Sequence, residues 1–313
     1  VICPCDAIIC GKEQDHCYLC DIVELLLMAN ILSVENLTHH WGDIRLFNSL
    51  TFGLEEGEKA ALIARNGTGK TTLLNILAGK QVPDGGTVTI RKGIRTGYLV
   101  QDPVFPAGKT VIESLLSGDN ELIKAVRVYE EALESNDQAL IGKMVEKMDA
   151  MGAWDYETRV RQVLDKLKIT RLNQPVEQLS GGQQKRLALA AVLLEEPDFI
   201  ILDEPTNHLD IDMVDWLEDY LSRNRATLLM VTHDRFFLDR VCNVIFEMDD
   251  ETLYKYTGNY SYFLEKRDER IDQRNQEIDR ARNLLRKEQD WMNRQPQARA
   301  TKAKYRIDAY YEL

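Results

Sequence analysis

The sequence lacks any long hydrophobic run. Its 313 residues contain no stretch of the ~18–20 apolar residues that a transmembrane helix needs. The nearest approach, residues 22–32, is too short and includes Glu24 and Asn30. No basic segment precedes it, which argues against a secretory signal peptide. We therefore predict a chain that has no transmembrane segment and works in the cytoplasm.

Cysteine is scarce outside one segment, because five of the six cysteines lie within the first twenty residues and only Cys242 follows. His16 beside Cys17-x-x-Cys20 has the residue types of a zinc site. No second C-x-x-C or histidine pair follows, so zinc is the weaker reading. A coherent strand pattern begins near Met28, and we interpret residues 1–27 as an upstream or non-native leader. Metal binding by this leader stays open.

Positive charge is also scarce, since 39 lysines and arginines face 51 acidic residues and the net charge is −12. This balance argues against a uniformly basic nucleic-acid binder. The charge is unevenly distributed: residues 266–306 carry +6, and the remainder of the chain carries −18. A basic segment after an acidic globule suggests an anionic partner such as RNA, and a solvated helix face is the alternative.

The hydrophobic pattern predicts an α/β core that is interrupted by a helical insert and followed by a charged helix. In the insert, apolar residues recur every three or four positions. The predicted strands cover 30–37, 50–54, 59–64, 86–91, 94–100, 199–203 and 227–231, with a hairpin over 243–256. The predicted helices cover 70–78, several segments within 110–170, 181–195, 211–222, 234–240 and a long exposed stretch, 260–294.

A glycine-containing loop, A-R-N-G-T-G-K-T-T at 64–72, joins a predicted strand to a predicted helix. Backbone N–H groups of such a loop and the dipole of the following helix bind phosphate. Lys70 is expected to reach the β- and γ-phosphates, and the Thr71 hydroxyl to ligate Mg²⁺. The pattern has glycine where this chain has Ala64; if that position needs a positive φ, the alanine costs on the order of 1 kcal/mol. The predicted ATP-binding residues of the loop are Asn66, Gly67, Thr68, Gly69, Lys70, Thr71 and Thr72.

Two adjacent carboxylates, Asp203 and Glu204, end the apolar strand 199–203. They repel each other at the edge of a core unless a divalent cation and Lys70 offset their charge. We expect Asp203 to hold Mg²⁺ through its water shell, and Glu204 to polarise the water that attacks the γ-phosphate. The predicted cofactors are therefore ATP and Mg²⁺.

A second possible anion site is L-S-G-G-Q at 179–183, which leads directly into a helix. Alone it could be a simple helix cap with a flexible turn. The order along the chain is more specific: the phosphate loop, Gln101 after the apolar run 97–100, L-S-G-G-Q, the Asp-Glu strand, and His233 after strand 227–231. Across nearly all of residues 30–256, this order resembles the ATP-binding cassette superfamily.

The resemblance implies a P-loop NTPase fold in a cassette that spans 28–258, with a mixed sheet core, an antiparallel β subdomain and a helical insert over about 102–180. It implies a catalytic role for Glu204, a γ-phosphate contact for His233, and for Gln101 a Mg²⁺ ligand that couples the site to the insert. The implied signature residues, which bind a nucleotide held by a different cassette, are Ser180, Gly181, Gly182 and Gln183.

Two further roles are implied by the resemblance. Asp210 would bridge two cassettes. Trp41, in H-H-W-G-D, occupies the place of the aromatic residue that stacks on adenine. A tryptophan at this place could equally be a core residue, because tryptophan is highly buried on average.

Three segments look like the ABC-F group, proteins with two cassettes in one chain that act on ribosomes. They are T-N-H-L-D at 206–210, H-D-R-F-F-L at 233–238, and Y-T-G-N-Y at 256–260 before the charged helix. Residues 259–313, with Trp291, the stretch 295–299 and Lys302, resemble an incomplete inter-cassette linker.

The resemblance to this group implies an ATPase clamp that contacts ribosomal RNA through the linker, in translation regulation or antibiotic protection. Its expected partner is a second cassette, either a missing C-terminal half or a second copy placed head-to-tail. The ATPase subunit of a membrane transporter and a DNA-binding ATPase stay open as alternatives. A chromosome-type cassette does not fit, because only 132 residues separate Lys70 from Leu202 and no long coiled coil lies between them.

Overall fold

The computed structural model describes residues 30–115, 121–172, 174–249 and 251–293. The chain divides into two compact units, Val1–Thr257 and Gly258–Leu313. The predicted division into leader, cassette and linker stays a prediction. Its leader, 1–27, and the linker residues from 294 onward lie outside the described residues.

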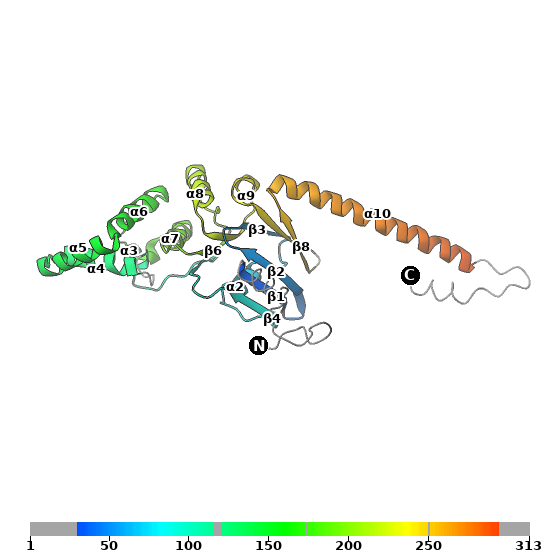
Figure 1. The fold of residues 1–313 in the computed structure, drawn as a ribbon, viewed down its shortest axis with the longest axis horizontal. Coiled ribbons are helices and arrows are strands. Elements are labelled where there is room, and N and C mark those ends of the chain that lie inside the picture. Colours follow the sequence, from blue (N-terminus) through cyan, green and yellow to red (C-terminus); the bar gives the residue numbers. More distant parts are fainter. Residues whose placement is uncertain (1–29, 116–120, 173, 250, 294–313) are drawn as a thin grey trace, which may run out of the picture. The chain divides into compact units, whose positions relative to one another are not determined.

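A six-stranded sheet forms the centre of the first unit, in the order β5-β6-β7-β3-β8-β9. Figure 1 labels β3, β6 and β8 of this sheet. All neighbouring pairs are parallel except β8 and β9, which form an antiparallel hairpin. Every residue of β6 and β7 is buried, as expected for central strands covered on both faces. The strands are β3 (Lys59–Ala64), β5 (Thr96–Leu99), β6 (Phe199–Asp203), β7 (Thr227–Val231), β8 (Val244–Asp249) and β9 (Thr252–Thr257).

A smaller antiparallel sheet has the order β2-β1-β4. Its strands are β1 (Asn30–Trp41), β2 (Ile44–Glu55) and β4 (Gly85–Ile90). Side chains from both sheets and from helix α2 (Lys70–Leu77) share one hydrophobic core, which includes Phe47, Leu74, Phe199 and Phe246. This shared core supports the start of α2, where the phosphate loop is predicted.

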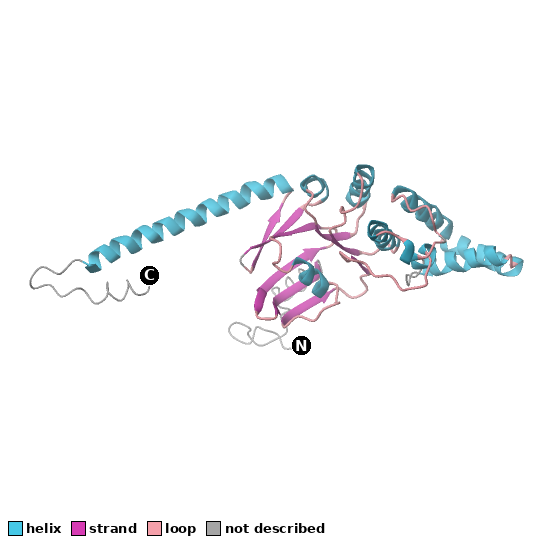
Figure 2. Cartoon of the chain, turned by 180° about the vertical axis from the view of Figure 1, so that it is seen from behind, coloured by secondary structure: helices cyan, strands magenta, loops and turns pink. Residues whose placement is uncertain are grey.

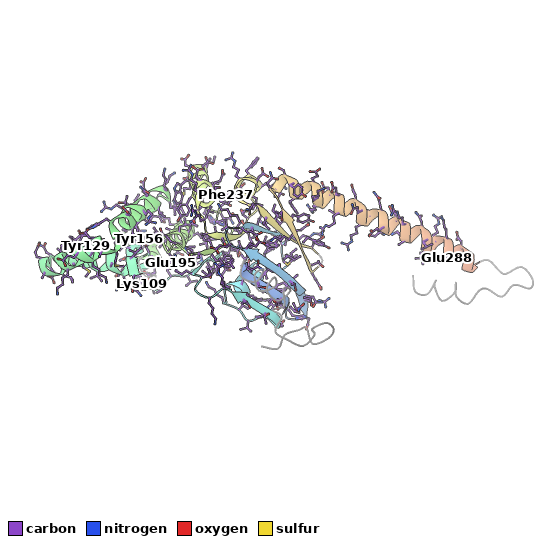
Figure 3. All side chains as sticks on the ribbon, in the orientation of Figure 1. Lys109, Tyr129, Tyr156, Glu195, Phe237 and Glu288 are labelled. Atoms are coloured by element: carbon purple, nitrogen blue, oxygen red, sulfur yellow. The ribbon has the colours of Figure 1, made fainter. Side chains whose placement is uncertain are left out.

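Helices cover the larger sheet and form the predicted insert. The insert helices are α3 (Val111–Leu115), α4 (Glu121–Ser135), α5 (Gln138–Met151) and α6 (Ala153–Lys166), and the others of this unit are α7 (Gly181–Leu194), α8 (Ile211–Arg223) and α9 (Arg235–Val241). Helices α4 and α5 lie farthest from the sheets (Figures 1 and 2). Tyr129 of α4 meets Trp154 of α6 edge-on, with 5.2 Å between ring centroids. Tyr156 of α6 is buried. Figure 3 labels Tyr129 and Tyr156 on the insert helices.

The second unit contains one long helix, α10 (Tyr260–Asn293). Asn259 caps its start, because the Asn259 Oδ1 accepts a hydrogen bond from the backbone N of Tyr262 at 3.1 Å. The helix is largely exposed and highly charged, as the sequence predicts. Within the described ranges, no helix combines the length and the apolar character of a bilayer-spanning segment.

Candidate functional site

A cavity of about 440 Å³ opens at the carboxyl ends of β3, β6 and β7, beside the start of α2. Ligands of parallel α/β sheets bind at this edge. Eleven of the predicted site residues line it, together with three apolar residues that sequence reasoning missed. The lining residues are Trp41, Ile44, Leu46, Asn66, Gly67, Gly69, Lys70, Thr71, Thr72, Gln101, Asp203, Glu204, Val231 and His233.

The phosphate loop curls around the ammonium group of Lys70. Gly67 and Gly69 adopt left-handed backbone conformations, with φ of 82° and 94°. The Lys70 Nζ donates hydrogen bonds to the carbonyl oxygen of Ala64 (2.9 Å) and to the Asn66 Oδ1 (3.2 Å). Burial lowers the pKa of Lys70, which nearby carboxylates partly offset. A lysine held at the loop by weak neutral acceptors can exchange them for phosphate oxygens.

Ala64 does not carry the strain that a positive φ would impose. It is the last residue of β3 and is not among the non-glycine residues with positive φ. The conditional penalty expected from the missing glycine therefore does not arise in this structure. The loop accepts alanine because its sharp turn falls at Gly67 and Gly69 instead.

The Thr71 hydroxyl and the Asp203 carboxylate meet inside the cavity. The Thr71 Oγ1 donates a hydrogen bond to the Asp203 Oδ2 at 2.9 Å, and Asp203 is only 3% exposed. Burial raises the pKa of Asp203, although the Thr71 hydrogen bond and the Lys70 charge oppose this. A hydroxyl beside a buried carboxylate is the hard oxygen donor set that Mg²⁺ takes together with phosphate oxygens. These two residues therefore fit a magnesium ion.

Glu204 is held in an unusual backbone conformation next to His233. Its φ is 53°, in the left-handed region that costs a non-glycine residue about 1 kcal/mol or more. Its backbone N donates to the carbonyl oxygen of Val231 at 2.8 Å, which fixes the turn after β6. The Glu204 Oε1 lies 3.5 Å from the His233 Nε2. Burial raises the pKa of Glu204, while the attraction of His233 lowers it.

The open side of the cavity carries two large apolar side chains. Trp41 is 66% exposed and Ile44 is 67% exposed, and the two residues pair across the end of the β1–β2 hairpin. The alternative that Trp41 is a core residue is therefore wrong. An exposed indole at a cavity wall offers a flat surface on which an aromatic ring can stack.

The predicted signature residues, 180–183, form the capped start of helix α7. None of them is among the described residues that line the cavity. The Ser180 Oγ accepts from the Gln183 backbone N, and the Gln183 side chain accepts from the Ser180 backbone N. This capping box gives acceptors to two backbone N–H groups at the N-terminal end of α7. A Cβ added at Gly182 would lie 3.4 Å from the His208 Cβ, so the two segments pack closely. Thr68 also lies outside the lining, and its hydroxyl donates to the Arg65 carbonyl oxygen.

Asp210 has partners that sequence reasoning missed. Its carboxylate caps α8 by accepting from the Met213 backbone N at 3.1 Å. Its Oδ2 also lies 2.5 Å from the Nζ of Lys168, which follows the last insert helix. The Lys168 hydrogen bond is the main reason that the pKa of Asp210 is lowered. No pattern in the sequence links these two residues, which lie 42 positions apart.

Comparisons with known proteins decide the family. A family model described as ABC transporter matches residues 47–207, and a second model with the same description matches 246–313. The chain belongs to the ATP-binding cassette superfamily, as a member of the ABC-F type. The predicted family is therefore confirmed, and the cavity lies in an ATP-binding cassette.

Relatives of this ABC-F-type chain include two bacterial proteins. It is 45% identical over 288 residues to the uncharacterized ABC transporter ATP-binding protein YfmR of Bacillus subtilis, covering 89% of this chain and 46% of the relative. It is 35% identical over 290 residues to the energy-dependent translational throttle protein EttA of Mycobacterium tuberculosis, covering 90% of this chain and 52% of the relative. The chain thus spans about half the length of the curated relatives it matches.

A solved structure confirms the predicted fold class. The ATP-binding subunit of an ABC transporter superposes with a TM-score of 0.56 at 22% identity, over 72% of this chain and 90% of that subunit. At this identity the likeness concerns the fold alone. The mixed sheet, the antiparallel β subdomain and the helical insert of the ABC-F-type chain agree with it.

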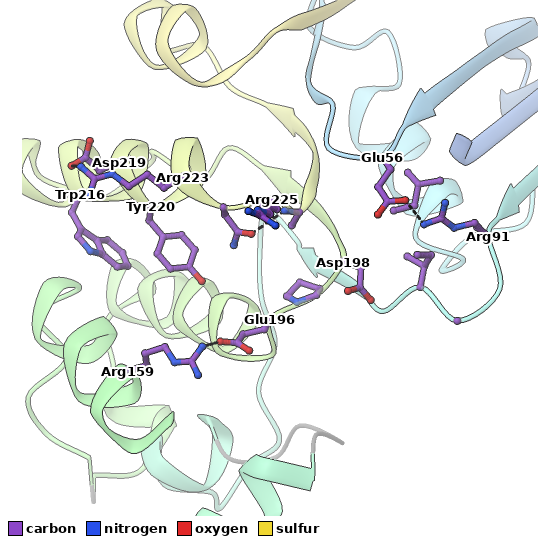
Figure 4. A pocket seen from close by; sticks show the side chains of 16 residues that line it. Glu56, Arg91, Arg159, Glu196, Asp198, Trp216, Asp219, Tyr220, Arg223 and Arg225 are labelled. Carbon is purple, nitrogen blue, oxygen red and sulfur yellow. Dashed lines mark hydrogen bonds and ion pairs between the residues drawn. The ribbon is translucent and has the colours of Figure 1, made fainter. Parts of the chain in front are cut away.

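A larger cavity of about 910 Å³ lies at the amino ends of β6 and β7, opposite the edge where ligands of such sheets bind (Figure 4). Trp216 and Tyr220 form part of its wall, and most of its charged residues are already paired. The pairs are Arg91 with Glu56, Arg159 with Glu196, and Arg223 with Asp219. Because these pairs neutralise one another, the cavity shows no surplus charge that would indicate a phosphate ligand. The smaller cavity is therefore the candidate nucleotide site.

Proposed function

We propose that this chain binds Mg-ATP in the smaller cavity and hydrolyses it as one cassette of a nucleotide-driven clamp that acts on the ribosome. One observation carries the ATPase part of this proposal. Lys70, the Thr71–Asp203 pair and the Glu204–His233 pair converge on a single cavity, although they come from distant parts of the sequence. This is the set of groups that phosphoryl transfer to water requires.

The phosphate loop supplies the binding half of the reaction. Backbone N–H groups between Asn66 and Thr71 and the N-terminal end of α2 bind the phosphates. Lys70 exchanges its hydrogen bond to the Ala64 carbonyl for contacts to the β- and γ-phosphates. Thr71 and Asp203, with Gln101 of the same cavity lining, would hold Mg²⁺, which neutralises charge on the phosphate oxygens when bound.

Glu204 supplies the reactive half. Its carboxylate accepts a proton from the attacking water as the water oxygen bonds to the γ-phosphorus. The bond from that phosphorus to the β–γ bridging oxygen breaks, so that ADP leaves and inorganic phosphate forms. A pKa raised by burial makes it a stronger base than an exposed glutamate. His233, 3.5 Å away, orients the carboxylate and contacts the γ-phosphate.

A partner cassette completes the site in this proposal. The capped start of α7, with Ser180 and Gly182, lies outside the cavity lining, which suits a motif that binds the nucleotide of another cassette. The chain alone is therefore expected to hydrolyse ATP slowly. The pairing partner is either a second cassette that a longer protein carries or a second copy placed head-to-tail.

The ribosome is the proposed target. One relative is named a translational throttle protein, and the chain is of the ABC-F type. Residues 294–306 carry five lysines and arginines and no acidic residue, whereas α10 has eight basic and eight acidic side chains. The positive charge offered to ribosomal RNA therefore comes from the segment after α10, beyond the acidic cassette in the sequence. Cytoplasmic location follows from this proposal.

Two experiments test the proposal. Sedimentation of a Glu204→Gln variant with Mg-ATP is expected to show a nucleotide-dependent dimer, and a strict monomer under all nucleotide conditions would count against head-to-tail pairing of two copies. Co-sedimentation with ribosomes across a salt series is expected to show binding that persists at physiological salt. Binding that is lost there would favour a transporter subunit or a DNA-binding ATPase instead.

A further inference from the structure

The residues before Trp41 are tied to a turn from another part of the chain. Strand β1 pairs with β4 as far as Thr38 and Gly85, so this ladder ends three residues before Trp41. Beyond that point β1 is held by the side-chain carboxylate of Asp84 and no longer by backbone hydrogen bonds to β4. The Asp84 Oδ2 accepts a hydrogen bond from the backbone N of His40 at 2.7 Å and lies 3.0 Å from the His40 Nδ1. The backbone N of Asp84 in turn donates to the Thr38 carbonyl oxygen at 3.1 Å.

This tether lies directly beside the exposed end of the hairpin. Trp41 and Ile44 are both about two-thirds exposed and line the nucleotide cavity. A side chain with this much exposed surface is stabilised little by its own packing contacts. Its position therefore depends on the contacts that fix its backbone. The hydrogen bonds from His40 lower the pKa of Asp84, which therefore remains ionised at neutral pH and keeps its acceptor strength.

We propose that Asp84 is a positioning residue for the base of the bound nucleotide. By holding the backbone of His40, it places the Trp41 ring where the base stacks. The inference rests on the ATP site of the proposed function, and it adds a residue to that site from outside the cavity lining. Among the described residues, the contacts of Asp84 go to β1 rather than to the phosphate loop. Its loss should therefore weaken binding of the base and leave binding of the phosphates intact.

The expected effect is partial, because the hairpin has a second tether. The Arg45 Nε lies 2.8 Å from the Glu251 Oε2 on the side away from β4. Complete loss of base stacking corresponds to roughly a 5- to 150-fold loss of affinity. Loss of the Asp84 hydrogen bonds alone should weaken ATP binding by about 3- to 10-fold.

The test compares ligands with and without a base. Calorimetry on the full chain measures the affinity for Mg-ATP and for Mg-tripolyphosphate, in the unchanged protein and in Asp84→Asn and Asp84→Ala variants. We expect Asp84→Ala to lose ATP affinity by about 3- to 10-fold, while tripolyphosphate affinity stays within twofold. Asp84→Asn should lose less ATP affinity, because its amide oxygen can still accept from the His40 backbone N. The matched control is Asp43→Asn, which removes an exposed acid from the turn of the same hairpin and should change neither affinity.

A double-mutant cycle distinguishes positioning from a general effect on the fold. In a Trp41→Ala background, Asp84→Ala should reduce ATP affinity by less than about twofold further, because no ring remains to be positioned. Equal losses for ATP and tripolyphosphate, or an undiminished Asp84 effect without Trp41, would overturn the inference. An unchanged protein that binds neither ligand would instead refute the proposed ATP site.

Discussion

Replacing Asp203 with asparagine should stabilise the nucleotide-free protein and destroy its response to Mg-ATP. The carboxylate is 3% exposed, and its pKa is raised because burial disfavours the charged form. An amide at this position removes the buried charge, and its oxygen still accepts the Thr71 hydrogen bond. The gain should be on the order of 1 kcal/mol, which raises Tm by about 2–4 °C for a unit of this size.

The raised pKa of Asp203 also determines how the stability of the protein changes with pH. A carboxyl whose folded-state pKa is raised binds more protons in the folded than in the unfolded state, so its contribution to stability falls as pH rises through the folded-state pKa. The stability advantage of the Asp203→Asn variant should therefore be largest near pH 7. It should shrink as pH falls toward the ordinary aspartate value of 3.8.

Binding of Mg-ATP should reverse the order of Tm, so that the unchanged protein melts above the Asp203→Asn variant. Mg-ATP at a hundred times its Kd stabilises the unchanged protein by about 2.7 kcal/mol, or roughly 5–10 °C in Tm. The Asp203→Asn variant lacks a magnesium-holding carboxylate and should lose most of this rise. Differential scanning fluorimetry with and without Mg-ATP measures both quantities.

The control is Asp198→Asn, at the other end of β6. Burial alone would raise the pKa of Asp198, but hydrogen bonds from Arg95 lower it overall. This variant should lose stability without ligand and keep its full response to Mg-ATP. A nucleotide-free Asp203→Asn protein that melts below the unchanged one would contradict a destabilising buried charge at Asp203, and one that keeps the full Mg-ATP response would contradict its role in holding magnesium.

Four further outcomes are expected. Glu204→Gln should keep Mg-ATP affinity within about threefold and lose hydrolysis by at least a hundredfold, measured by phosphate release; a variant with more than a tenth of normal turnover would contradict a proton-accepting role. The acid limb of the pH–rate profile should lie above the ordinary glutamate value of 4.5, because burial raises the pKa of Glu204 and the base acts only when ionised. Gly182→Asp should leave ATP affinity unchanged and abolish nucleotide-dependent pairing in sedimentation, whereas normal pairing would exclude that helix start from the partner's site. Trp41→Ala should weaken binding of ATP by roughly 5- to 150-fold and spare tripolyphosphate, and equal losses would show that the ring acts on the fold.

Strands and helices with strong local signals were predictable from the sequence. β3 has the predicted bounds, 59–64, because its apolar run stops at a glycine-containing loop. Likewise, α7 begins at the predicted residue, since Ser180 and Gln183 form a capping box that the motif itself encodes. The hairpin of β1 and β2 is longer than predicted, because most of its outer residues, such as His40, Trp41 and Ile44, are exposed and do not alternate with buried apolar ones. Phe47, which is buried, lies too far from the other apolar residues to reveal the strand by itself.

The residues of the site were predictable from the sequence, but the contacts between them were not. The phosphate loop and the Asp-Glu strand predicted that Lys70 and Asp203 share one Mg-ATP site. The structure adds the Thr71–Asp203 hydrogen bond, which joins the start of α2 to the end of β6. The ion pair of Lys168 with Asp210 escaped prediction because it depends on tertiary packing between distant segments. The exposure of Trp41 was undecided in the sequence for the same reason, since local pattern does not separate a core indole from a cavity wall.

The central claim is that Lys70 and the Asp203 end of β6 together bind a magnesium-complexed triphosphate. Its most direct test is the affinity of the purified chain for ATP, measured by calorimetry with and without Mg²⁺, in the unchanged protein and in a Lys70→Ala variant. The account predicts magnesium-dependent binding that the variant loses by at least a hundredfold. No binding in the presence of metal, or equal affinity in the two proteins, would contradict it.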